Sequence, residues 1–189
     1  MPSSDINMIP RVIAVVKLIH PSSILDVGFG NGRYGVLFRE CFDWNYGRLL
    51  PDSWKLKLHG VDIDKTYVTP VHSYVYNKID IYDWLYDKPE EKYDLLFMGD
   101  ILEHFRDGQW QHALEKARHF SRFTLVVSPN WKGSLEQGSW NGHHQEKHWS
   151  ILSPATVGGR CLFANSKMFM VAFDNEDTGI LETRDICLI

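Results

Sequence analysis

A short apolar segment that ends in an acid and continues through three alternating glycines constrains this chain more than any other feature. The segment reads Ile24-Leu25-Asp26-Val27-Gly28-Phe29-Gly30-Asn31-Gly32-Arg33, and a helical pattern follows it over 33–42. Glycine lacks a Cβ atom, so the backbone can turn sharply and come close to a ligand. Free N–H groups at the start of the next helix favour a negatively charged ligand group. The segment therefore predicts a strand, a binding loop and a helix in succession.

Two common phosphate-binding loops do not fit this glycine spacing. A dinucleotide-binding loop has the pattern G-x-G-x-x-G/A, and here Arg33 stands where the third small residue is needed. A bulky side chain at that position would obstruct close packing of the helix on the strand. A P-loop requires Lys-Ser or Lys-Thr after its glycines, and neither pair follows Gly32. A nucleotide-dependent oxidoreductase is therefore the least favoured of three functional hypotheses.

Apolar strand patterns alternate with helical patterns along most of the chain. We expect strands at 23–27, 56–61, 77–81, 93–99 and 123–128, and helices at 10–19, 33–42, 66–74 and 109–120. This order is typical of βαβ units and of a parallel sheet with helices on both faces. The end of the chain differs, because 167–173 and 180–188 are expected to form an antiparallel hairpin. The 189 residues predict one domain spanning 1–189.

The glycine segment resembles motif I of the class I S-adenosylmethionine-dependent methyltransferases, which has the form [D/E]-x-G-x-G-x-G. Four further segments are similar to landmarks of that family and occur in its order: Val61-Asp62-Ile63-Asp64, Ile79-Asp80-Ile81, Asp100-Ile101-Leu102-Glu103-His104 and Val127-Ser128-Pro129-Asn130. The resemblance extends from about residue 24 to residue 189. It implies a Rossmann-like, mostly parallel seven-stranded sheet with an antiparallel C-terminal hairpin. It also implies S-adenosyl-L-methionine as cofactor and methyl transfer to an O, N or C nucleophile of a small-molecule acceptor.

The resemblance also implies how the methionine and ribose parts of the cofactor are held. Asp26 would bind the ammonium group, and the backbone N–H groups of 28–32 would reach the carboxylate. The alternative for Asp26 is a plain helix N-cap. Asp62 would accept both ribose hydroxyls, since an ionised carboxylate has paired acceptor oxygens. Asp64 is the competing ribose ligand, and Asp62 is favoured because it ends the apolar strand directly.

On the adenine side, Asp80 would accept a hydrogen bond from the amine, with Ile81 beside the ring and Asp83 as a competing acid. Asp100 and Ile101 would line the cofactor cleft opposite the glycine loop. The complete set of expected cofactor-binding residues is Asp26, Gly28, Phe29, Gly30, Gly32, Asp62, Ile63, Asp80, Ile81, Asp100 and Ile101.

Candidate catalytic residues follow the fourth and fifth strands. His104 comes just after the fourth strand, at the edge where open α/β sheets bind ligands, and could act as a general base. It could equally be a histidine satisfied by Glu103 or by the backbone. Glu146-x-His148-x-Ser150 after Pro129-Asn130 resembles a segment that lies over the acceptor pocket in small-molecule methyltransferases. The expected catalytic residues are therefore His104, His148 and Glu146.

Residues 130–150 fit no helix or strand and are expected to form a long loop or lid, since loops of this length are usually functional. Trp131, Trp140 and Trp149 would close over the acceptor or stabilise the sulfonium by cation–π contact. The alternative is packing on another element or on a second subunit, as in a homodimer. The run 143–148 could hold a metal ion through its histidines, but no cysteine is near and the spacing matches no known motif. No metal is therefore expected.

The composition and net charge indicate which kinds of partner and which cellular compartment are expected. A net charge of −4 implies no general basic face, so a nucleic acid is disfavoured as partner. No apolar run approaches the roughly 20 residues needed to cross a bilayer. Three widely spaced cysteines and no signal-peptide pattern argue for reduced thiols in a cytoplasmic protein. The second functional hypothesis is non-enzymatic: a sensor or partner subunit that binds S-adenosylmethionine or S-adenosylhomocysteine.

Overall fold

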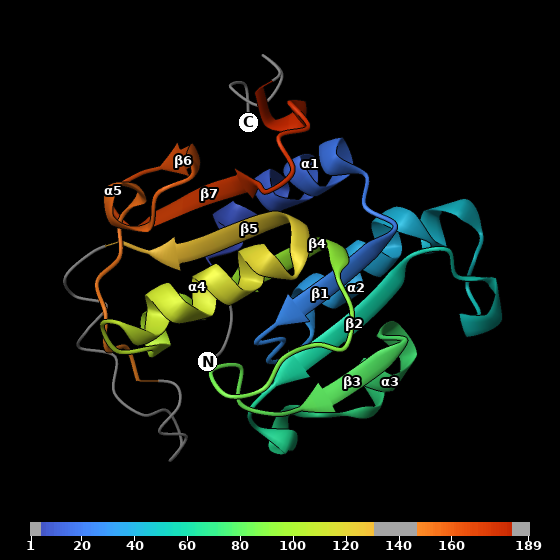
Figure 1. The fold of residues 1–189 in the computed structure, drawn as a ribbon. Helices are drawn as coiled ribbons and strands as arrows, with labels where there is room; N and C mark the ends of the chain where they lie inside the picture. Colours follow the sequence, from blue (N-terminus) through green and yellow to red (C-terminus); the bar gives the residue numbers. More distant parts are fainter. Residues whose placement is uncertain (1–4, 131–146, 183–189) are drawn as a thin grey trace.

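The core of the molecule is a mixed β-sheet. Its strands are β1 (Ser23–Val27), β2 (Lys57–Asp62), β3 (Lys78–Ile81), β4 (Tyr93–Gly99), β5 (Ser121–Pro129), β6 (Arg160–Ala164) and β7 (Met168–Asp174). Within residues 5–130 and 147–182, which the computed structural model describes, these seven strands form one sheet in the order β3-β2-β1-β4-β5-β7-β6 (Figure 1). Neighbours from β3 to β5 are parallel, whereas β7 runs antiparallel to both β5 and β6. The strand order reverses between β1 and β4, which is where open α/β sheets bind ligands.

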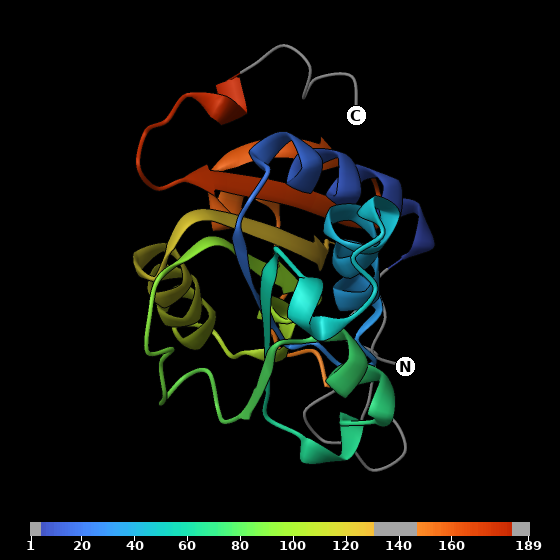
Figure 2. The same ribbon diagram turned by 90° about the vertical axis from the view of Figure 1, so that its right-hand side faces the viewer.

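Helices cover both faces of this sheet (Figure 2). They are α1 (Ile9–Ile19), α2 (Arg33–Phe42), α3 (Pro70–Val75), α4 (Gln109–His119) and α5 (Pro154–Val157). α1, α2 and α3 contribute to the core cluster on one face, and α4 and α5 contribute to the cluster on the other. β4 supplies both clusters, because Leu95 and Phe97 point to the first and Leu96 and Met98 to the second.

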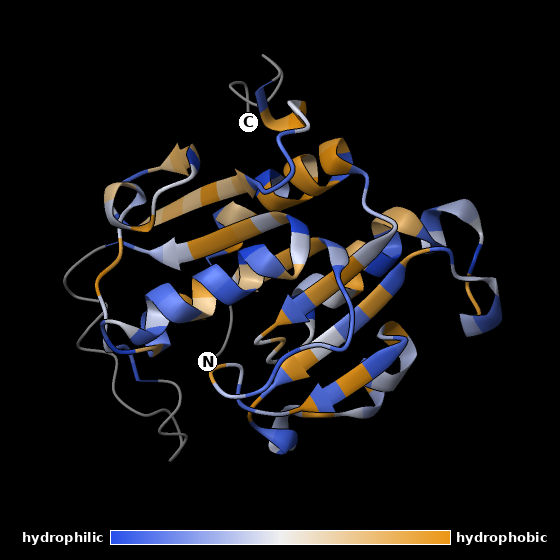
Figure 3. Ribbon diagram, viewed as in Figure 1, coloured by the Kyte–Doolittle hydropathy of each residue, from blue (hydrophilic) through white to orange (hydrophobic). Residues whose placement is uncertain are grey.

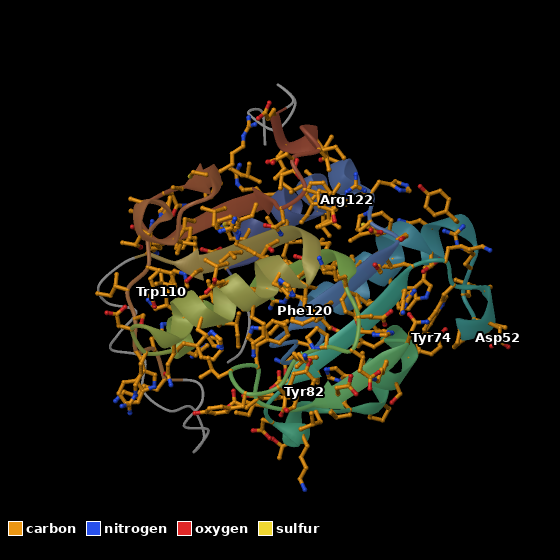
Figure 4. The ribbon with its side chains drawn as sticks, viewed as in Figure 1. Asp52, Tyr74, Tyr82, Trp110, Phe120 and Arg122 are labelled. Atoms are coloured by element: carbon orange, nitrogen blue, oxygen red, sulfur yellow. The ribbon has the colours of Figure 1, made fainter. Side chains whose placement is uncertain are left out.

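Burial on both faces explains why β5 and β7 are mostly apolar along their length (Figure 3). α4 has one buried side, which includes Trp110, Ala113, Leu114 and Ala117. Trp110 lies near the start of α4 and Phe120 just past its end (Figure 4). The buried residues of α4 recur at helical spacing, which agrees with the helix expected over 109–120.

The expected elements from β1 to β5 are confirmed with small shifts at their ends. α1 ends at Ile19 and is capped by His20, which lies just before Pro21, adopts a left-handed conformation and donates its N–H to the Val16 carbonyl. The helix expected over 66–74 is shorter, because Pro70 starts α3 instead of lying inside it. A proline is tolerated in the first turn of a helix, where its missing N–H would have no partner.

The C-terminal hairpin lies earlier in the chain than expected. It pairs β6 with β7, and the expectation that 180–188 forms the last strand is wrong for its described part: Ile180–Glu182 is a short 3-10 turn. Residues 183–189 lie outside the described residues. Asn165 closes the hairpin, because its side chain accepts from the N–H groups of Lys167 and Met168. β6 is an edge strand that is only partly buried, so it lacks the strongly apolar pattern of the inner strands.

The described part of the chain contains no helix that is both long enough and apolar enough to span a bilayer.

Candidate functional site

The glycine loop connects β1 to α2 in a backbone conformation that suits glycine. Gly28, Gly30 and Gly32 have φ values of 75°, 50° and 72°, in the left-handed region that disfavours side chains. A Cβ atom on Gly28 would lie 2.7 Å from Cδ1 of Ile101, which follows β4. Ile101 therefore packs directly against the loop, where the sequence predicted the opposite wall of the cofactor cleft.

The close contact between Gly28 and Ile101 predicts how a side chain at position 28 changes the stability of the protein. Gly28→Ala is expected to lower the free energy of unfolding by roughly 2–4 kcal/mol, because left-handed strain of about 1–2 kcal/mol adds to overpacking against Ile101. Gly47→Ala is the matched control, since Gly47 has a φ of 74° and nothing within 4 Å of its added Cβ. It should lose only the strain. Urea unfolding of both variants measures the difference, and equal losses would show that Ile101 does not restrict the loop.

The buried rings of His72 and Tyr76 pack against the glycine loop. The Phe29 side chain packs on His72 and Tyr76, with ring centroids 5.0 Å and 5.7 Å apart. Phe29 was expected among the cofactor-binding residues; its side chain is 5% exposed and belongs to the core cluster beside the loop. His72 Nε2 lies 3.0 Å from the Gly30 carbonyl oxygen, and its Nδ1 accepts from the Thr69 N–H. A carbonyl can only accept, so these contacts place the proton on Nε2.

Asp26 lies on β1 just before the loop and is 2% exposed. The Tyr76 hydroxyl donates to its Oδ2 at 2.6 Å. Burial raises the pKa of Asp26 to about 7, and the charge of Asp62 adds to the rise, whereas the Tyr76 hydrogen bond opposes it. Asp26 does not cap α2, because the N-cap is Gly32 and no side chain makes the capping hydrogen bond. Gly35 leaves room for Tyr76, whose hydroxyl would collide with a Cβ there.

Asp62 joins the end of β2 to the glycine loop. It is 7% exposed; its Oδ2 accepts from the Gly30 N–H at 2.9 Å and its Oδ1 from the Asp64 N–H at 3.0 Å. Burial raises the pKa of Asp62, and these backbone donors oppose the rise. The side chain of Asp64 instead accepts from the Thr66 N–H and caps a short 3-10 turn. Of the two acids considered for the ribose, the structure brings Asp62 to the loop.

The ends of β2 and β3 present apolar side chains beside this buried acid. Ile63 is 51% exposed and Ile81 is 42% exposed, and Ile81 pairs with Asp62 across the two strands. Asp80 Oδ2 lies 3.0 Å from Lys78 Nζ, while Asp83 accepts from the Leu85 N–H in the following turn. A buried acceptor beside exposed apolar surface fits a ribose with an attached flat ring. Together with the glycine loop, these residues fit S-adenosylmethionine.

The segment after β4 forms the opposite side of the site. Asp100 has a φ of 52° and donates its N–H to the Val127 carbonyl of β5 at 2.9 Å. A 3-10 turn follows over Leu102–His104. Glu103 in this turn is fully buried, and its Oε2 accepts from the Ser128 hydroxyl at 3.0 Å. The turn therefore points a carboxylate inward from the sheet edge where ligands bind.

Residues 147–150 are hydrogen-bonded along this turn. The N–H groups of Trp149 and Ser150 both donate to the Glu103 carbonyl, at 2.8 Å and 3.2 Å. The Ser150 hydroxyl donates to the Phe105 carbonyl at 2.7 Å. His148 is thereby held against His104, with ring centroids 4.8 Å apart. Two of the three expected catalytic residues are thus brought together.

The remaining expectations for 130–150 have mixed outcomes. Glu146, Trp131 and Trp140 lie outside the described residues. Trp149 is described, and its ring contacts two of the protein's own cations: the Arg106 guanidinium at 4.5 Å and the Lys147 ammonium at 3.9 Å. Pattern reasoning missed the buried contributions of His72, Tyr76 and Glu103. The one local signal was Gly35, a glycine inside a helical pattern, which makes room for Tyr76.

Comparisons with known proteins support the fold. No protein-family model matches the sequence, and a search of the curated proteins finds no match. Among solved structures, the methyltransferase domain of bacterial CtHen1 has a TM-score of 0.59 at 17% identity, covering 90% of this chain and 100% of that chain. The N-terminal domain of EvdMO1 with S-adenosylhomocysteine bound has a TM-score of 0.58 at 15% identity, covering 90% and 80%. Protein PH0226 from Pyrococcus horikoshii OT3 has a TM-score of 0.61 at 12% identity, covering 89% of each chain. The chain therefore has the fold of the class I S-adenosylmethionine-dependent methyltransferases.

Proposed function

We propose that this protein binds S-adenosylmethionine at the glycine loop and transfers its methyl group to a small-molecule acceptor. The observation that carries the proposal is the position of Asp62. Its carboxylate is buried at the end of β2, accepts from the Gly30 N–H of the loop, and adjoins the exposed side chains of Ile63 and Ile81. When bound, the cofactor supplies a methyl group activated by a positively charged sulfur.

Each part of the cofactor has a candidate partner in this arrangement. Asp26 would hold the ammonium group of the methionine end, and Asp62 would accept from the ribose hydroxyls. The N–H groups expected to reach the methionine carboxylate are mostly engaged within the protein: those of Gly28 and Phe29 donate to the Val61 carbonyl, that of Gly30 to Asp62 and that of Gly32 to the Phe29 carbonyl. Asp80 would accept from the adenine amine, with Ile63 and Ile81 against the ring. Asp100 and Ile101 would form the opposite wall, a role supported by the packing of Ile101 on Gly28.

The acceptor would lie beside His104 and His148. Holding two reactants in one orientation supplies much of the rate enhancement for such a transfer. For a hydroxyl acceptor, a neutral imidazole at this place could remove the proton. The net charge of −4 favours a small molecule over a nucleic acid. The structurally similar EvdMO1 domain was crystallised in the presence of S-adenosylhomocysteine and D-fucose, which supports the same choice.

Calorimetric titration of the full chain with S-adenosylhomocysteine tests the proposal. One site with a dissociation constant near 1 μM, about −8 kcal/mol, is expected. S-adenosylmethionine should bind with similar affinity. NADH is the control ligand and should not bind, because Arg33 occupies the place of the third small residue of a dinucleotide loop. Absence of binding by both adenosyl compounds would contradict the proposal.

A further inference from the structure

Three metal-ligating side chains meet on the acceptor side of the proposed cofactor site. Glu103, His104 and His148 each offer one ligand atom, and these atoms all lie within 4.8 Å of one another. Glu103 and His148 are buried, and His104 is partly exposed. An ion at about 2.1 Å from its ligand atoms holds them at most ~4.2 Å apart, so small side-chain rotations would complete the site.

Hydrogen bonds orient His104 as a metal ligand requires. Its Nδ1 lies 3.2 Å from the Lys147 carbonyl oxygen. Because a carbonyl can only accept, this contact places the proton on Nδ1 and leaves the lone pair of the neutral ring on Nε2. Metal-ligating histidines usually donate their other ring N–H to a carbonyl or carboxylate in this way. The Ser128 hydroxyl similarly holds Oε2 of Glu103.

The backbone holds the cluster together before any ion binds. The Glu103 carbonyl accepts from the N–H groups of Trp149 and Ser150. Two further contacts join the same segments: the Lys147 carbonyl lies beside His104 Nδ1, and the Phe105 carbonyl accepts from the Ser150 hydroxyl. These bonds join the turn after β4 to residues that follow β5. The three side chains therefore converge through the tertiary structure.

We propose that Glu103, His104 and His148 bind one divalent first-row transition-metal ion, of the Zn²⁺ or Fe²⁺ type. Imidazole ligands suit these ions, whereas Mg²⁺ and Ca²⁺ prefer sites made of oxygen ligands alone. Three protein ligands leave a coordination position open for a further oxygen, as in catalytic zinc sites. Where the proposed methyl transfer holds, that position would take an acceptor hydroxyl. The two imidazoles would then act as ligands of the ion instead of as free bases.

The test is calorimetric titration of the full chain, stripped with EDTA and dialysed, with ZnCl₂. The wild-type chain is expected to bind one equivalent at the cluster. Glu103→Gln keeps an acceptor for the Ser128 hydroxyl, and His148→Phe keeps a ring against His104; each should weaken binding at that site at least tenfold. The two variants remove ligands from different segments, and circular dichroism checks that each is folded.

Two controls identify the site. His119→Phe replaces an exposed histidine at the end of α4 that packs edge-on against Phe120, and it should leave Zn²⁺ affinity unchanged. The double change His143→Gln and His144→Gln should also leave it unchanged. Wild-type affinity in Glu103→Gln and His148→Phe would overturn the proposal, as would loss of the bound equivalent in the double variant alone.

The same preparations separate this inference from the proposed function. S-adenosylhomocysteine binding by the stripped chain tests the cofactor site without an ion. Zn²⁺ binding that depends on the cluster, with no S-adenosylhomocysteine binding, would support the metal site and contradict the proposed function. S-adenosylhomocysteine binding with the same Zn²⁺ affinity in wild type and both cluster variants would overturn the metal site alone.

Discussion

Asp62→Asn is expected to weaken S-adenosylhomocysteine binding at least 100-fold. The proposed cofactor site gives the Asp62 carboxylate two ribose hydroxyl donors, and a hydrogen bond to a charged group contributes about 1.5–3 kcal/mol. Losing the charge and one acceptor oxygen therefore costs roughly 3 kcal/mol or more, at 1.4 kcal/mol for each factor of ten. The substituted amide keeps one oxygen for the Gly30 N–H, so the loop should retain its conformation. Calorimetric titration measures the loss.

Asp64→Asn is the matched control for this prediction. Its carboxylate lies two residues further along the chain but accepts from the Thr66 N–H in a surface turn. The affinity for S-adenosylhomocysteine should change less than threefold. If Asp64→Asn lost the affinity and Asp62→Asn kept it, the ribose would be assigned to Asp64. Equal, small effects in both variants would place the ribose elsewhere.

Asp26→Asn is expected to stabilise the ligand-free protein at pH 8 by up to ~4 kcal/mol. In the folded protein, burial raises the pKa of Asp26 to about 7, against about 3.9 in an unfolded chain. The stability that the neutral carboxyl contributes is fully present below about pH 4 and is lost as the pH rises through about 7. Above that pH, the folded state carries a buried charge, and each unit of pKa difference costs about 1.4 kcal/mol. Asparagine is neutral throughout.

Urea unfolding of wild type and Asp26→Asn at pH 5 and pH 8 measures this difference. The stability gained by the variant should be larger at pH 8 than at pH 5. Glu115→Gln, which changes an exposed acid on α4, is the control for loss of a carboxylate. Asp26→Asn should also weaken S-adenosylhomocysteine binding, because the acid proposed for the ammonium group is gone. A pH-independent difference between wild type and Asp26→Asn would contradict the raised pKa of Asp26.

Opposite effects on stability and binding would identify Asp26 as a residue retained for its ligand. A carboxylate in a site 2% exposed is costly for the free protein. The Tyr76 hydroxyl offsets part of that cost through its hydrogen bond. Buried groups with strongly shifted pKa values cluster at functional sites, which agrees with the position of Asp26 directly before the glycine loop.

Local sequence patterns were sufficient for the parallel part of the sheet and for the glycine loop. Strands buried on both faces are mostly apolar, so β1, β4 and β5 were recognisable from short windows. The glycines from Gly28 to Gly32 predicted a sharply turning loop, and the structure gives Gly28, Gly30 and Gly32 left-handed conformations that strain other residues. β6 was missed because a half-exposed edge strand carries a weak apolar pattern, and its pairing with β7 decided its place.

The tertiary structure alone decided which polar groups meet at the site. His72 reaches the Gly30 carbonyl across 42 residues, and Tyr76 reaches Asp26 across 50. The sequence predicted that His104 and His148 could act together as catalytic residues, but their contact depends on backbone hydrogen bonds to the Glu103 carbonyl. A local pattern encodes the burial and the conformation of its own segment. Contacts between distant side chains depend on how the folded segments pack, and here that packing brings Glu103, His104 and His148 together.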